Sequence, residues 1–125
     1  PLMDWHHSGR AEGSSRENIA RQMATVELIG PDGMIMHETV RVGLFMQSAN
    51  VDYVTREHAA EETFIMLCGS GMWSQNNEPL APRKSGDYIH HPSMMPHVSV
   101  TYDSPFIAAW RWTGDIGYDK YSLTG

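Results

Sequence analysis

The strongest constraint on the fold is a series of short segments that are rich in β-branched and aromatic residues and bounded by Gly, Pro, Asn or Asp. These segments span residues 24–28, 34–47, 51–58, 63–75, 87–93, 97–102 and 106–114. The first two are separated by Gly30-Pro31-Asp32-Gly33, which is a strong turn signal. Many short strands with little helix between them are typical of a β-barrel or β-sandwich. We therefore predict an all-β fold.

The N-terminal part of the chain has a different character. Residues 1–15 are polar and contain two glycines, so we expect a flexible lead-in there. Ser14 and Glu17 have the spacing of a capping box, which predicts a short helix at about residues 15–22. The chain has 125 residues, which suits one core, and we expect a single domain at residues 16–125.

Composition narrows the classes of partner. The net charge of −6 makes nucleic acid and anionic membranes unfavourable partners. No apolar stretch approaches the roughly 20 residues of a membrane span, and no signal-peptide pattern is seen. Cys68 is the only cysteine, which fits a reducing compartment, so we expect a cytoplasmic protein. We expect Cys68 to be buried, and the strand methionines to fill the core: Met34, Met36, Met46, Met66 and Met72.

A first candidate site combines a histidine and a carboxylate. His58 lies four residues before Glu62, and Gly69 follows after an apolar run that we expect to lead into a turn. On a strand, or a strand with its preceding turn, His58, Glu62 and Phe64 share one face because even spacings do. An imidazole and a carboxylate that converge inside a barrel suit a divalent transition metal. The alternative interpretation is an ordinary surface pair.

A second candidate site lies downstream, where three histidines fall within eight residues: His90, His91 and His97. Prolines bracket the segment before His97 and hold this corner of the chain rigidly. His90 and His91 have opposite parity, so at most one of them faces the barrel interior.

These two motifs together resemble the cupin family. The first has His58, three residues, Glu62, six residues and Gly69; the second has Gly86-Asp87 and later Pro96-His97. Cupins are small single-domain barrels with a double-stranded β-helix, or jelly-roll, fold and one metal held by His and Glu. The resemblance implies that His58, Glu62 and His97 bind one divalent metal ion. Zn, Fe, Mn, Co and Ni all accept such ligands.

The segments "HAAEE", "HPSMMPH" and "WRWTGDI" are more specifically similar to the cupin-type dimethylsulfoniopropionate lyases. This resemblance implies a metal-dependent carbon–sulfur lyase that forms dimethyl sulfide and acrylate by α-proton abstraction and β-elimination. Two positions depart from the family. Arg56 stands where the family has a further histidine, and Phe64 stands where the family has a tyrosine that serves as metal neighbour and base.

Because of these two departures, the base and the role of residue 56 cannot be taken directly from the family. Phe64 has no titratable proton and cannot act as a base. Tyr53 matches a second tyrosine of the family and is our candidate base, alongside Glu62, and the other tyrosines that could take this role are Tyr102, Tyr118 and Tyr121. Arg56 can bind a substrate carboxylate through two parallel hydrogen bonds.

The sulfonium end of such a substrate requires a different partner. Aromatic faces attract onium cations, so Trp73, Trp110 and Trp112 join Phe64 as candidate substrate-binding residues. Trp110 and Trp112 share one face by parity. For each tryptophan the alternative is plain core packing.

Three functions therefore stay open. The first is the lyase. The second is a cupin metalloenzyme of another class, an Fe-dependent dioxygenase or an isomerase, because two histidines and a glutamate with open positions also suit oxygen activation. The third is a non-catalytic module that binds a small ligand, which Phe64 favours. All three require a small-molecule partner, and a small barrel with an exposed sheet edge also allows a homodimer.

Overall fold

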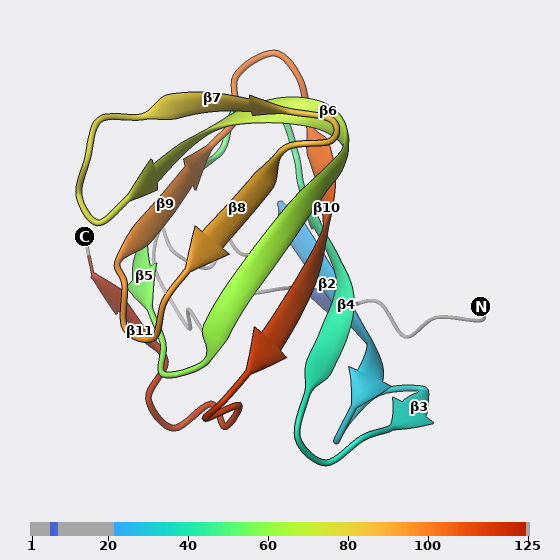
Figure 1. Ribbon diagram of the computed structural model, residues 1–125. Coiled ribbons are helices and arrows are strands. Elements are labelled where there is room, and N and C mark those ends of the chain that lie inside the picture. Colours follow the sequence, from blue (N-terminus) through green and yellow to red (C-terminus); the bar gives the residue numbers. More distant parts are fainter. Residues whose placement is uncertain (1–5, 8–21, 125) are drawn as a thin grey trace.

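The computed structural model describes residues 6–7 and 22–124 (Figure 1). Within these residues the chain forms eleven strands and no helix, which confirms the all-β prediction. Consequently, no helix in this part of the chain is long and apolar enough to cross a membrane. The short helix expected at about residues 15–22 lies almost entirely outside the described residues. That helix and the boundary at residue 16 stay predictions.

The strands are short except for one. Their bounds are β1 His6–His7, β2 Met23–Gly30, β3 Ile35–Met36, β4 Arg41–Gln47, β5 Asp52–Glu57, β6 Glu61–Gln75, β7 Ala81–Lys84, β8 Tyr88–His91, β9 His97–Val100, β10 Phe106–Thr113 and β11 Ser122–Thr124. The hydrogen-bonded order is β1-β2-β4-β10-β6-β9-β5-β11, with β3 beside β2, and β7 and β8 beside β6. Apart from β2 and β3, all paired strands are antiparallel.

Strand β6 joins the two halves of the barrel (Figure 1). Its first half pairs with β8 and β10, and its second half pairs with β7 and β9. The prediction of a turn at Gly69 is wrong, because β6 continues through this residue as one strand. Gly69 has a φ of +80°, and a Cβ there would overlap the carbonyl oxygen of Pro105. Glycine thus lets the strand bend and pass from one sheet to the other without ending.

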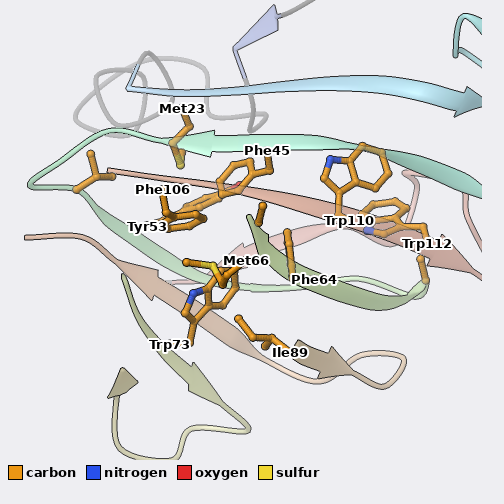
Figure 2. Close-up of a cluster of buried hydrophobic side chains, with 13 residues drawn as sticks. Met23, Phe45, Tyr53, Phe64, Met66, Trp73, Ile89, Phe106, Trp110 and Trp112 are labelled. Atoms are coloured by element: carbon orange, nitrogen blue, oxygen red, sulfur yellow. The ribbon is translucent and has the colours of Figure 1, made fainter. Parts of the chain in front are cut away.

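Aromatic side chains fill the interior (Figure 2). The ring of Phe45 lies 6.2 Å from that of Tyr53, 6.1 Å from that of Phe64 and 5.8 Å from that of Phe106. Burying each such side chain contributes roughly 1.5–3 kcal/mol. Trp110 and Trp112 are both buried, with exposed Arg111 between them, so the predicted parity of β10 is confirmed.

The predicted burial of the methionines is correct only in part. Met66 is fully buried, but Met34, Met36 and Met46 are exposed, and so is Cys68. Met34 and Met36 belong to the β3 region, which pairs with β2 and lies off the main strand order of the sheet. Met46 points outward because its neighbours in β4, Phe45 and Gln47, point inward. Side-chain polarity alone did not indicate which face of each strand is covered.

Candidate metal centre

Five elements meet at the candidate metal centre. Glu62 lies near the start of β6, directly opposite His91 of β8 on one side and Trp112 of β10 on the other. His97 begins β9, where it pairs with Arg56 of β5. His58 lies in the connection from β5 to β6, and not on a strand. The preceding turn, rather than strand parity, therefore brings His58 toward Glu62.

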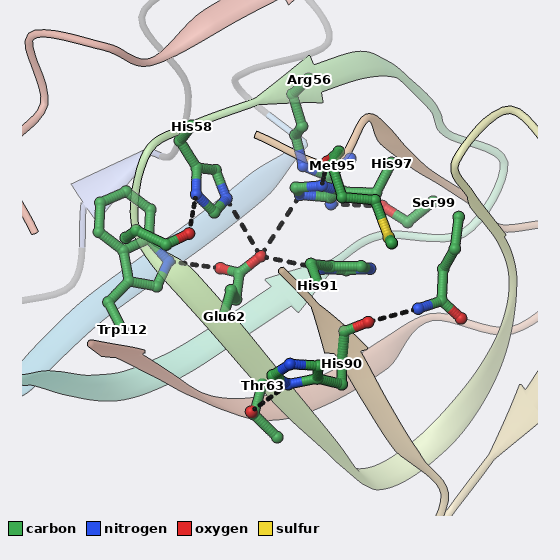
Figure 3. Close-up of polar contacts among 12 residues, drawn as sticks. Arg56, His58, Glu62, Thr63, His90, His91, Met95, His97, Ser99 and Trp112 are labelled. Carbon is green, nitrogen blue, oxygen red and sulfur yellow. Dashed lines mark hydrogen bonds and ion pairs between the residues drawn. The ribbon is translucent and has the colours of Figure 1, made fainter. Parts of the chain in front are cut away.

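One carboxylate oxygen is the focus of this site (Figure 3). Glu62 Oε1 lies 3.2 Å from His58 Nε2, 3.3 Å from His97 Nε2 and 3.3 Å from His91 Nδ1. The other oxygen, Oε2, accepts a 2.6 Å hydrogen bond from Trp112 Nε1. The donor atoms of His58, Glu62 and His97 lie within 4.8 Å of one another, and all three residues are buried. This group can hold a metal ion.

Backbone contacts decide which ring nitrogens carry lone pairs. His58 Nδ1 lies 3.0 Å from the carbonyl oxygen of Ala60, and His97 Nδ1 lies 3.0 Å from that of Met95. Because a carbonyl only accepts, both Nδ1 atoms donate, and in the neutral rings both Nε2 atoms carry a lone pair. Both lone pairs face Glu62 Oε1, and His97 Nε2 makes no hydrogen bond despite its 3.3 Å separation.

Electrostatics favour a metal ion over a proton between these atoms. Burial, with a smaller effect from the charge of Arg56, lowers the pKa of His97 to about 3. His97 is therefore neutral, and its Nε2 lone pair faces the Glu62 carboxylate, so a cation between the two atoms would remove their repulsion. The residues present therefore fit a divalent transition metal.

Aromatic stacking holds the histidine rings in place. Trp112 stacks on His58 with ring centroids 4.5 Å apart, and Tyr121 stacks against His58 at 5.5 Å. His91 stacks on His97 at 3.9 Å with an interplanar angle of only 10°. His91 does not belong to the group of donor atoms that can hold a metal ion, which consists of His58, Glu62 and His97. We therefore interpret His91 as a hydrogen-bond donor to Glu62, which stabilises the carboxylate, and not as a ligand.

Arg56 is buried beside the metal centre. Its Nη2 donates to Ser99 Oγ at 3.1 Å, and its guanidinium lies 3.8 Å from the centre of the Tyr53 ring. Its Nη1 is buried without a hydrogen-bond partner. None of the ion pairs in the described part of the chain includes Arg56. The barrel thus contains a buried cation that no protein carboxylate neutralises.

Tyr53 and Tyr121 form a pair next to this arginine. Their hydroxyl oxygens lie 2.9 Å apart. Burial, reinforced by the charge of Tyr53, raises the pKa of Tyr121 well above its ordinary value. Tyr121 therefore keeps its proton and can donate to Tyr53 Oη. Sequence reasoning named Tyr121 as a candidate but had no means to place it, because residues 53 and 121 meet only in the folded chain.

The remaining candidates lie at different distances from the centre. Trp73 is buried, with its ring 4.9 Å from Phe64 and 5.8 Å from His91. The Trp110 ring lies 6.2 Å from the Trp112 ring, and Trp110 Nε1 donates to Thr25 Oγ1 at 3.2 Å. Tyr102 is 58% exposed, whereas Tyr118 packs against Trp112. Of the two adjacent histidines, His91 points inward and His90 outward, as their parity predicts.

Comparison with known proteins agrees with this geometry. The family model for dimethylsulfoniopropionate lyase matches residues 1–108. The dimethylsulfoniopropionate lyase DddQ of Ruegeria pomeroyi is 33% identical over 89 residues, which are 71% of this chain and 44% of that protein. This chain belongs to the dimethylsulfoniopropionate lyase family.

The solved structures confirm the fold. The crystal structure of that DddQ superimposes with a TM-score of 0.86 and 27% identity, covering 98% of this chain and 61% of that chain. A cupin-like protein of Thermotoga maritima gives a TM-score of 0.70 at 14% identity, covering 82% of this chain and 76% of that one. The predicted cupin barrel is therefore confirmed. This chain spans less than two thirds of the length of DddQ by either comparison.

Proposed function

We propose that this chain is a metal-dependent lyase that cleaves dimethylsulfoniopropionate to dimethyl sulfide and acrylate. The observation that carries the proposal is the buried donor group of His58, Glu62 and His97 in a member of this lyase family. We assign one divalent transition metal to these three residues, with Zn, Fe, Mn, Co and Ni all compatible. When bound, the metal would supply Lewis-acid stabilisation of the negative charge that develops on the substrate carboxylate.

Protein side chains bind the substrate carboxylate and accept the α-proton. Arg56 binds the substrate carboxylate and thereby places the adjacent α-carbon near Tyr53, over whose ring the guanidinium lies. We assign Tyr53 as the base that accepts the α-proton. The released electron pair forms the carbon–carbon double bond of acrylate, and the β-carbon–sulfur bond breaks with its electrons leaving on dimethyl sulfide. The Tyr121 hydroxyl, 2.9 Å away, donates to the Tyr53 oxygen before the proton arrives.

Aromatic residues also take part in substrate binding, and Trp112 is the residue that we assign to the sulfonium group. We assign Phe64, Trp73, Trp110 and Trp112 to substrate binding, with Trp112 best placed because it touches both His58 and Glu62. Glu62 acts in catalysis as the anionic metal ligand, which Trp112 and His91 hold in position.

Two other functions compete with this proposal. Two histidines and one glutamate also suit an Fe-dependent dioxygenase, and an isomerase can use the same ligands. Phe64 in place of a catalytic tyrosine favours a non-catalytic module that binds a small ligand. Turnover separates the lyase from the binding module, and a requirement for oxygen separates it from the dioxygenase.

The test is release of dimethyl sulfide into the headspace over metal-loaded protein and dimethylsulfoniopropionate. We expect release that disappears in Glu62→Ala and falls by at least about 100-fold in Tyr53→Phe, which lacks the base. Absence of release with each of the five metals would contradict the lyase assignment. A cytoplasmic location and a homodimer stay predictions.

A further inference from the structure

Two buried N–H groups beside the metal centre have no hydrogen-bond partner within the part of the chain that the structure describes. They are Arg56 Nη1 and Trp73 Nε1, on residues that are 3% and 1% exposed. The two residues are neighbours, since Arg56 Cζ lies 5.7 Å from the centre of the Trp73 ring. Buried donors are nearly always paired in folded proteins, so two unpaired donors on adjacent side chains indicate a missing acceptor.

We infer that Arg56 and Trp73 form a carboxylate subsite that binds a short organic acid even when no metal is present. The inference rests on the proposed function only for the choice of acid, because acrylate is the product of that reaction. The subsite itself follows from the contacts of the two residues.

The charge and the donor geometry together select a carboxylate. A guanidinium donates through a planar fork that matches two carboxylate oxygens, and Trp Nε1 adds one further donor and no acceptor. A buried water can satisfy the donors but leaves the charge of Arg56 uncompensated. A monoanion that only accepts hydrogen bonds satisfies both requirements.

This subsite fixes the orientation of the ligand. Arg56 pairs with His97 across β5 and β9, so a carboxylate on Arg56 lies on the His97 side of the metal centre. Trp73 then serves the carboxylate end through its N–H, and its ring already faces the Arg56 cation. The sulfonium end is directed away from this cation, toward the Trp112 and Tyr121 rings that stack on His58.

The experiment uses the full chain treated with a chelator, so that no metal takes part. The chain has four tryptophans, so a proton–nitrogen correlation spectrum contains at most four indole N–H signals. The Trp73→Phe variant assigns the Trp73 signal and retains an aromatic ring. Acrylate is titrated against acrylamide, which has a similar shape but no charge.

We expect acrylate to shift the Trp73 indole signal saturably and to bind at least about tenfold more tightly than acrylamide. Arg56→Gln should weaken acrylate binding by at least about tenfold, and Trp73→Phe by about fivefold, the effect of one hydrogen bond. Arg111→Gln is the matched control, because it removes the same charge from an exposed position of β10 and should bind acrylate unchanged.

Equal affinity for acrylate and acrylamide, or unaltered acrylate binding by Arg56→Gln, would overturn the subsite and leave a buried water as the occupant. The comparison of two ligands on the unsubstituted protein decides the question even where a variant does not fold. Failure of the subsite and of the proposed function are distinguishable. Acrylate binding without dimethyl sulfide release contradicts only the lyase, and release without metal-free acrylate binding contradicts only the subsite.

Discussion

Arg41 and Arg56 are both buried in the barrel, but they differ in how completely their hydrogen-bonding groups are used. Arg41 Nη1 lies 2.8 Å from both Glu27 Oε1 and Asp32 Oδ2, and its Nε donates to the carbonyl of Ile116 at 2.9 Å. Among the described residues, the Arg56 side chain donates only to the neutral Ser99, and its Nη1 has no hydrogen-bond partner.

This difference separates a structural ion pair from a binding group. The charge of Arg41 is neutralised inside the protein, so its network joins β2, β4 and the segment after β10 and requires nothing further. No carboxylate in the described residues forms an ion pair with Arg56. Arg56 therefore lies beside the metal centre as the candidate anion-binding group, next to the His58, Glu62 and His97 donors that can hold a metal ion.

The sharpest test of this comparison is Arg41→Met. The substitution leaves the buried Glu27 carboxylate without its cationic partner, and we expect it to lower the free energy of unfolding by about 3–5 kcal/mol. Urea denaturation measures the change. The double variant with Glu27→Gln should recover part of this loss, because the unpaired carboxylate is removed. A loss no larger than that of Arg56→Met would remove the distinction between the two arginines.

The next largest effect is expected for the metal affinity of Glu62→Ala, which removes one of the three candidate metal ligands. Losing the anionic ligand should weaken binding of Zn²⁺ or Co²⁺ by at least about 100-fold, or about 2.7 kcal/mol. Isothermal titration calorimetry measures the affinity. Glu27→Ala is the control, because it removes the buried carboxylate that pairs with Arg41 and should leave metal affinity unchanged. Equal losses in the two variants would mean that overall destabilisation, and not ligation, explains the result.

A smaller effect is expected for Trp112→Phe. This change keeps a ring against His58 but removes the N–H that holds Glu62 Oε2. Loss of such a supporting contact typically weakens metal binding 10- to 100-fold, and we expect about tenfold, or about 1.4 kcal/mol, by the same titration. Trp110→Phe is the control, since its N–H bonds Thr25 and not Glu62. Metal affinity that is unchanged in Trp112→Phe would contradict the supporting role.

The smallest effect on stability is expected for Arg56→Met. No carboxylate loses its partner, and methionine keeps apolar contact with Tyr53, so the free energy of unfolding should change by no more than about 1 kcal/mol. Urea denaturation, run beside Arg41→Met, gives the comparison directly. A loss above about 3 kcal/mol would show that Arg56 is a structural residue.

The sequence by itself determined the barrel and the outline of the site. Strand parity placed Trp110 with Trp112 and separated His90 from His91, because side chains alternate along any strand whatever its partners are. The spacing of His58 and Glu62, together with the family resemblance, singled out the three residues that converge in the structure.

Only the tertiary structure decided the contacts between distant segments. Glu62 faces His91, Tyr53 meets Tyr121, and Arg56 lies over Tyr53 without a carboxylate partner. These contacts depend on cross-strand register, on the bend of β6 through Gly69 and on the turn that carries His58, none of which is encoded by local spacing. Residue type shows that an arginine can bind an anion. Only the folded structure shows that Arg41 is paired with carboxylates whereas Arg56 has no carboxylate partner in the described residues.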